Sequence, residues 1–135
     1  MRECIFYKCP NPLTITFNDD LEEIGGHISS GDTLVNVTNF NNLTHLHTVG
    51  EYGCSYLHGI DLSALPQSLT TLSTGAFSNC LYSSNSIVVG SGITSMANYA
   101  FSCSQGKTNM SNLDISQTSL TALPGYMVQN IIFNC

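Results

Sequence analysis

A four-residue pattern, apolar-Thr-x-apolar, recurs along this chain of 135 residues and limits the folds open to it. Four clear copies and one weaker copy begin 22 to 27 residues apart. They start at Leu43, Leu69, Ile93 and Leu120, with the weaker copy at Leu21. Between copies lies a second pair of apolar residues with period two, as at Ile87 and Val89. Each period therefore holds two short strand-like pieces, and the sequence predicts a solenoid of stacked coils.

A third element follows the four-residue pattern: a small residue, an aromatic residue and, three positions later, a cysteine. It is clearest at residues 76–80 (AFSNC) and one residue shorter at 100–103 (AFSC). Weaker copies end at Cys9 and Cys54, and Ile28 and Met127 are expected to fill the aromatic slot of two degenerate copies.

Residues 57–62 (LHGIDL), 69–72 (LTTL) and 76–80 (AFSNC) together resemble one coil of a BspA-type leucine-rich repeat. The resemblance covers residues 4 to 131, although Asn39 stands where an inward apolar residue belongs. It implies a β-rich solenoid, a right-handed leucine-rich-repeat superhelix of about five coils. A parallel sheet is expected on one side and short strands or 3₁₀ turns on the other, within a single domain over residues 1–135.

The repeat also predicts which side chains stack. Two inward apolar ladders are expected, Ile15, Val37, Ile60, Ile87, Leu113 and Leu46, Leu72, Met96, Leu123. Two outward ladders are expected on the first strand of each coil, Thr14, Asn36, Gly59, Ser86, Asn112 and Thr16, Thr38, Asp61, Val88, Asp114. Equivalent positions of successive coils lie about 4.8 Å apart, so a repeated charge would repel its own copy. This explains why only 9% of the residues are charged.

The net charge of −6 sets aside two classes of partner. Three basic residues provide no electrostatic footprint for nucleic acid or for an anionic membrane. No run of eighteen apolar residues is present, so membrane insertion is not expected. The N-terminal residues lack the apolar core of a secretory signal. The compartment is left open: intracellular, or extracellular and at the cell surface if the chain is part of a longer BspA-like protein.

The chain begins in mid-coil and ends on an apolar run at 131–135 (IIFNC). Solenoid ends need capping to stay soluble. The sequence therefore predicts an excerpt of a longer repeat array, or ends covered by a partner, which includes end-to-end self-association.

A metal site is one interpretation of His45, His47, Cys54 and His58, which fall within fourteen residues. In the repeat, however, Leu46 points inward, so its two histidine neighbours point outward, while Cys54 takes the inward cysteine slot. The four side chains cannot readily converge, and no metal is expected.

For the other candidate residues, the sequence also favours a structural role over a chemical one. Cysteines in the repeat slot (Cys9, Cys54, Cys80 and Cys103) are expected to be inert core residues, whereas Cys4 and Cys135 are the candidates for free or cross-linking thiols.

The acidic stretch 18–23 lacks the spacing and the glycine of a calcium loop and is expected to be a solvated turn. Asp61 and Asp114 are expected two coils apart, too far for paired catalytic carboxylates. Neither an enzymatic activity nor a cofactor is expected.

The outward face of the first strands is the remaining candidate site. A solenoid sheet is a broad, rigid platform for another macromolecule. The resemblance implies an interaction module of a surface or adhesin-like protein that binds another protein or a cell-surface molecule through its concave sheet. The residues expected to bind are Asn36, Thr38, Asp61, Asn112 and Asp114. The alternative is a structural spacer in a larger surface or viral fibre protein, with no ligand of its own.

Overall fold

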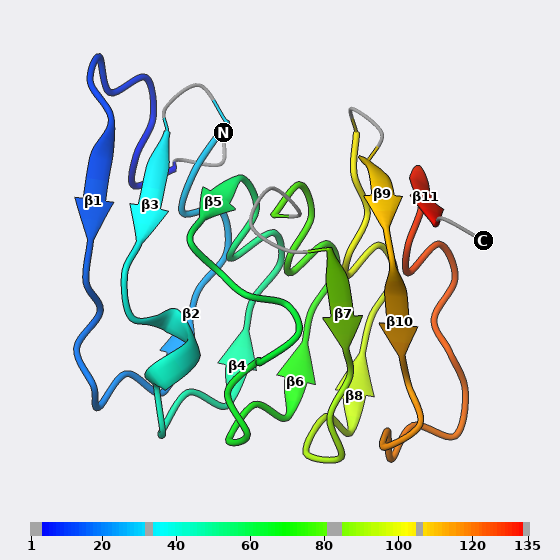
Figure 1. Cartoon of the computed structure of the whole chain (residues 1–135). Helices are drawn as coiled ribbons and strands as arrows, with labels where there is room; N and C mark the ends of the chain where they lie inside the picture. Colours follow the sequence, from blue (N-terminus) through cyan, green and yellow to red (C-terminus); the bar gives the residue numbers. More distant parts are fainter. Residues whose placement is uncertain (1–3, 32–33, 81–84, 105–106, 134–135) are drawn as a thin grey trace.

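A computed structural model describes residues 4–31, 34–80, 85–104 and 107–133 (Figure 1). The strands are β1 (Leu13–Ile15), β2 (Glu23–Ile24), β3 (Val35–Val37), β4 (Thr48–Val49), β5 (Leu57–His58), β6 (Thr71–Leu72), β7 (Ser86–Val88), β8 (Ser95–Met96), β9 (Lys107–Met110), β10 (Asn112–Asp114) and β11 (Ile131–Phe133). A single 3₁₀ turn, η1 (Phe40–Asn42), is the only helix among the described residues. The predicted parallel β-solenoid is confirmed.

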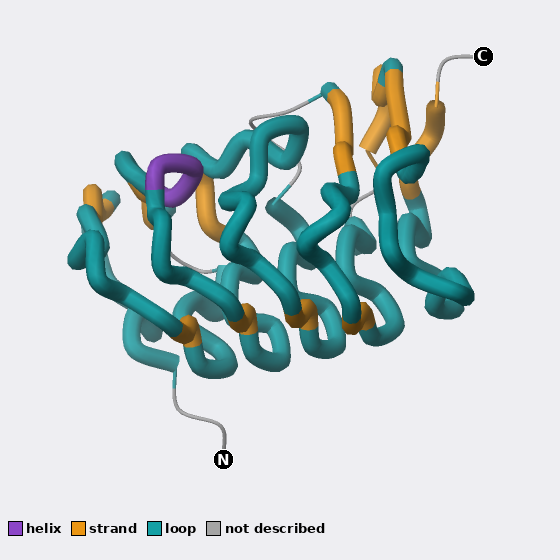
Figure 2. Tube along the Cα trace, turned by 90° about the horizontal axis from the view of Figure 1, so that it is seen from below, coloured by secondary structure: helices purple, strands orange, loops and turns teal. Residues whose placement is uncertain are grey.

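Each coil has two strand-bearing sides. On one, β2, β4, β6 and β8 form a continuous four-stranded parallel sheet, which we call the second-strand face. Its four short strands lie in a row in Figure 2. On the other, β1-β3-β5 and β10-β7 form two separate parallel pieces, which we call the first-strand face. A further parallel pair joins β9 and β11.

The described residues make about four turns rather than the five expected. The last copy of the four-residue pattern forms no strand, and its Leu123, expected to point inward, is 51% exposed. Residues preceding it are held by local turn bonds instead, from Thr118 N to Ile115 O (3.2 Å) and from Leu120 N to the Thr118 hydroxyl (3.1 Å).

The register of the second-strand face differs from the prediction by three residues in one coil. Val49, not Leu46, pairs with Leu72, which in turn pairs with Met96. The true copy is therefore 46–49 (LHTV) rather than 43–46 (LTHL). Both alignments place apolar residues inside, and Leu43, Leu46 and Val49 are all buried. Sequence alone could not choose between them.

The first-strand face is interrupted between β5 and β7. Asn36 pairs with His58 rather than with Gly59, and Val88 N donates to Leu62 O (3.0 Å). Leu62 therefore lies level with Ile87, where Ile60 was expected, because a parallel N–H bonds the carbonyl one residue before its partner. Residues 59–61, which lie between the paired positions His58 and Leu62, form a bulge around Gly59, whose φ is +83°. A Cβ there would lie 2.2 Å from Val37 O.

The third side of each coil is a series of turns, which we call the turn arm. It comprises residues 26–31, 51–56, 74–79, 98–103 and 125–130. Alternate amides donate to the next coil, as from Cys54 N to Ala76 O (2.9 Å), and the others close turns, as from Ser55 N to Tyr52 O (3.1 Å). This alternation satisfies backbone donors that a solenoid side without strands would otherwise bury unpaired.

The core lies between the three sides and is centred on phenylalanine. Phe77 stacks on Phe101 (centroids 5.7 Å apart, interplanar angle 6°) and meets Phe40 edge-on (5.7 Å, 89°). All three are at most 1% exposed. Ile28 and Met127 are also buried, but the backbone bonds place Ile28 level with Gly53 and Met127 level with Ala100, both in the small-residue slot rather than the aromatic one.

Candidate functional site

The five predicted binding residues fall into two patches and one junction. Asn36 lies on β3 and Thr38 directly follows it, while Asn112 and Asp114 lie on β10. Asp61 lies between the patches, in the loop after the bulge. The first-strand face therefore does not present the two unbroken outward ladders that equal coils would give.

Within each patch, polar side chains pair from coil to coil. The hydroxyls of Thr16 and Thr38 are 2.7 Å apart, and the Asn112 amide donates to the Ser86 hydroxyl (3.2 Å). Such pairs fix side-chain rotamers before any partner arrives, which lowers the entropy cost of binding.

Asp61 and Asp114 occupy matching local turns. Asp61 Oδ1 accepts from the Ser63 amide (2.9 Å) and hydroxyl (2.6 Å), and Asp114 Oδ1 accepts from the Ser116 amide (2.9 Å). The hydrogen bonds from Ser116 lower the pKa of the Asp114 carboxyl below its ordinary value. Both carboxylates are thus oriented by the chain itself, and the lowered pKa of Asp114 also favours its charged form. The β7 coil separates the two, as expected, because Asp114 pairs with Val88.

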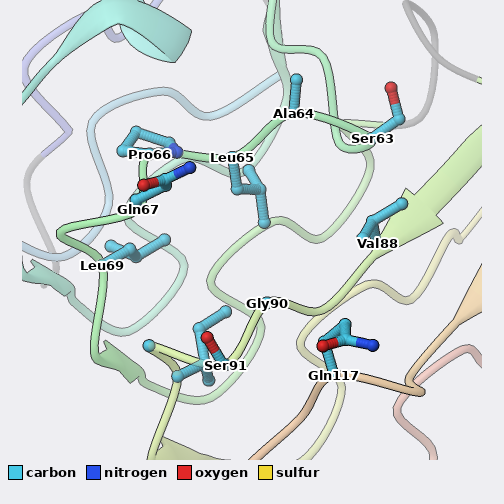
Figure 3. A pocket seen from close by; sticks show the side chains of 12 residues that line it. Ser63, Ala64, Leu65, Pro66, Gln67, Leu69, Val88, Gly90, Ser91 and Gln117 are labelled. Carbon is cyan, nitrogen blue, oxygen red and sulfur yellow. The ribbon is translucent and has the colours of Figure 1, made fainter.

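A hollow of about 470 Å³ lies beside this junction (Figure 3). Residues 63–67 and Leu69 border one side, and Val88 and Gln117 lie across from them. Its lining residues have no titratable side chain. The hollow can accept a neutral group, and its lining supplies no titratable acid or base.

Of the three histidines in the metal hypothesis, His45 and His47 point to solvent, whereas His58 is half-buried on β5 and burial lowers its pKa. The side chains of His45 and His47 are 59% and 49% exposed, and each lies near a carboxylate of the preceding coil, Asp20 at 4.0 Å and Glu22 at 3.9 Å. Cys54 is buried. No group of three or more His, Cys, Asp or Glu side chains that could hold a metal ion occurs in the part of the chain that the structure describes.

Two residues do not occupy the cysteine slot as predicted. Cys103 lies level with Asn79 rather than with Cys80, because the Asn79 amide bonds Ser102 O. Cys54 lies level with Phe77, in the aromatic slot, because its amide bonds Ala76 O, and Leu57 occupies the slot of Cys80. Cys54, Cys80 and Cys103 are nevertheless buried. Burial raises the pKa of Cys80 to about 12 and that of Cys54 well above its ordinary value. Both thiols therefore stay protonated and unreactive at neutral pH, as expected of core residues.

The other cysteine predictions have mixed outcomes. Cys9 is only partly buried, so it does not share the environment of the inner three. Cys4 is also partly buried. Cys135 lies outside the described residues.

The acidic stretch forms an exposed turn. Asn18, Asp19 and Asp20 are exposed, and Asn18 Oδ1 accepts from the Asp20 amide (3.1 Å). Residues 18–20 thus form a solvated turn as predicted, whereas Glu23, at the end of the same stretch, begins β2.

The turn arm is the surface that the sequence did not identify. Its outer positions carry His27, Tyr52, Tyr99 and Tyr126 at equivalent places in successive coils. The signal was a ring three residues after the last residue of the four-residue pattern, as at Tyr99 and Tyr126. The three-residue error in the register at 43–46 and the glycine at position 75 concealed it.

Comparison with known proteins identifies the repeat. Six copies of the BspA type leucine rich repeat region match residues 1–108 and 32–134. No curated protein and no solved structure matches. No helix among the described residues is long and apolar enough to cross a membrane.

Proposed function

The chain belongs to the BspA-type leucine-rich repeat family, and on that premise we propose that it is a protein-interaction module of a surface or adhesin-like protein. Leucine-rich repeats commonly present an extended surface to another macromolecule. The proposed binding surface is the first-strand face, with Asn36, Thr38, Asp61, Asn112 and Asp114 in contact with the partner.

The observation that carries this proposal is the pair of oriented carboxylates. Asp61 and Asp114 each use Oδ1 to close a turn with a serine two residues on. The chain carries only three basic residues, so its field is negative. A partner with a basic surface would be attracted to this face and oriented by it.

The test separates charge from turn geometry. Asp→Ala would remove the acceptor that closes each turn, so the variant we choose is Asp61→Asn/Asp114→Asn, which keeps Oδ1 and removes two charges. Wild type and variant are titrated against immobilised extracellular proteins that bind the wild type. The variant should bind at least about tenfold more weakly, with the difference shrinking at high salt because the interaction is electrostatic.

The matched control is Asp19→Asn/Glu23→Gln, which makes the same change in net charge at exposed positions away from this face. It should bind as the wild type does. Equal binding by the Asp61/Asp114 variant would remove this face from the proposal. If no extracellular protein binds the wild type, the spacer function replaces the binding one.

A further inference from the structure

A row of left-handed backbone positions runs along the turn arm. Backbone bonds from each coil to the next place five residues level with one another. They are His27 (φ 57°), Tyr52 (φ 53°), Gly75 (φ 62°), Tyr99 (φ 62°) and Tyr126 (φ 54°). We call this the tyrosine row. Glycine is the residue that suits such a conformation, and bulky residues are rare in it. Four of the five positions nevertheless carry a ring.

Strained residues of this kind point to a role for the side chain. Gly75 shows that the fold accepts glycine in the row. There the ring of Tyr52 covers the glycine, since a Cβ on Gly75 would lie 2.3 Å from Tyr52 Cε1. Tyr99 and Tyr126 stack with their centroids 5.3 Å apart at 5°, and Tyr126 is 64% exposed. Rings therefore follow one another along the row at the strand spacing, interrupted at Gly75, with Tyr52 and Tyr99 partly exposed and Tyr126 exposed.

Beside the tyrosine row lie two hollows of about 320 and 310 Å³. They share Tyr52, Tyr56, Ser78 and Asn79, so they are two parts of one groove. The polar side chains of its floor are already ordered. Ser102 donates to the Ser78 hydroxyl (3.4 Å), and Asn79 Oδ1 accepts from both the amide (2.7 Å) and the hydroxyl (3.0 Å) of Ser104.

The chemistry of the groove limits its occupant. No Asp, Glu, Lys or Arg lines either hollow, so a charged ligand gains nothing there. Each amide N–H from Tyr52 to Leu57 and from Gly75 to Cys80 already donates to a carbonyl. An extended peptide therefore finds no backbone donors with which to pair as an added strand.

We propose that the turn-arm groove binds a neutral oligosaccharide chain. The C–H faces of sugar rings carry partial positive charge and stack on the negative faces of aromatic rings. Sugar hydroxyls can exchange hydrogen bonds with the exposed polar side chains that line one hollow, Ser104, Gln129 and Asn130. The coil spacing of about 4.8 Å is close to the length of one sugar unit in an extended chain, so Tyr52 and Tyr99 would contact alternate units. The groove is open, so its affinity is weak for one short chain and rises with repeated contacts along a polymer.

The experiment uses neutral hexasaccharides of β-1,4-linked glucose, N-acetylglucosamine and mannose, with a heparin hexasaccharide as the charged comparison. The chain contains six tyrosines and no tryptophan, so tyrosine fluorescence reports directly on the rings. At least one neutral hexasaccharide should bind the wild type with a Kd of about 0.1–1 mM. Tyr99→Gly should weaken that binding at least about tenfold. Its urea midpoint should be unchanged or higher, because glycine relieves the left-handed backbone.

A control variant and a replacement variant accompany Tyr99→Gly. Tyr7→Ala removes a ring that is 58% exposed and lies outside the groove, and it should bind as the wild type does. Tyr99→Asn, which also tolerates the left-handed region, replaces Tyr99→Gly if the glycine variant does not fold. Failure of every neutral hexasaccharide at about 10 mM, binding of heparin alone, or equal binding by the Tyr99 variant would overturn the proposal. These outcomes do not depend on Asp61 or Asp114, so they leave the proposed function of the first-strand face untouched.

Discussion

Asn39 occupies a position where the repeat requires an apolar side chain, and its amide takes the place of a backbone pair. Its Oδ1 accepts from Phe17 N (2.9 Å) and its Nδ2 donates to Phe17 O (2.8 Å). Asn41 does the same toward the following coil, accepting from Asp61 N (2.9 Å) and donating to Asp61 O (2.7 Å). These two side chains tie three coils together where the strands have ended.

Asn39→Ala should therefore destabilise the fold by about 2 kcal/mol, because it leaves the partly buried N–H and C=O of Phe17 without their partners. Urea unfolding measures the change. The control is Asn42→Ala in the same 3₁₀ turn, whose exposed side chain should be replaceable within about 0.5 kcal/mol. Similar costs for the two variants would show that the Asn39 amide does not replace strand pairing.

At the scale of the element, the interruption of the first-strand face depends on one glycine. Gly59 allows the chain to stop pairing with β3 after His58 and to begin pairing with β7 at Leu62. The bulge places Asp61 in a loop, beside the hollow lined by residues 63–67 and Leu69. A regular strand would have placed the same carboxylate in a flat ladder.

Gly59→Ala should cost about 3 kcal/mol, since the added Cβ would lie 2.2 Å from Val37 O and the residue has a φ of +83°. Gly90→Ala is the matched change, because a Cβ at Gly90 meets nothing within 4 Å. It should be neutral or stabilise by up to about 1 kcal/mol. Thermal and urea unfolding of both variants compare the two positions, and equal stability would contradict the bulge.

At the scale of the whole molecule, stability depends on how many neighbours each coil has. The strands β4 and β6 are paired on both sides, whereas β1 and β2 have a partner on one side only. In a solenoid, each coil is stabilised mainly by its neighbours, so opening is expected to begin where one neighbour is absent.

The expected difference in stability between end and inner coils can be tested with two amides whose hydrogen bonds have the same length. Leu13 N donates to Leu34 O and Ser73 N to Val49 O, both at 2.9 Å. Hydrogen exchange at Ser73 should be at least about tenfold slower than at Leu13 after correction for intrinsic rates, since Ser73 lies in an inner coil. Equal protection would indicate that the solenoid opens as one cooperative unit.

The sequence by itself determined the family, the solenoid and the burial of its core. Periodicity carries this information because every coil must bury the same positions against its neighbours. It also placed His45 and His47 outside, since both flank the buried Leu46 in either register. It also predicted that Cys54, Cys80 and Cys103 are buried, although Cys54 fills the aromatic slot rather than the cysteine slot.

The tertiary structure decided the register and the surfaces. Leu43, Leu46 and Val49 are spaced three apart, so two alignments bury apolar residues equally well, and only pairing with Leu72 selects one. The bulge at Gly59 divides the predicted binding face, and the left-handed row brings the tyrosines together. Both depend on backbone dihedrals and on bonds between residues more than twenty positions apart, which a local pattern does not encode.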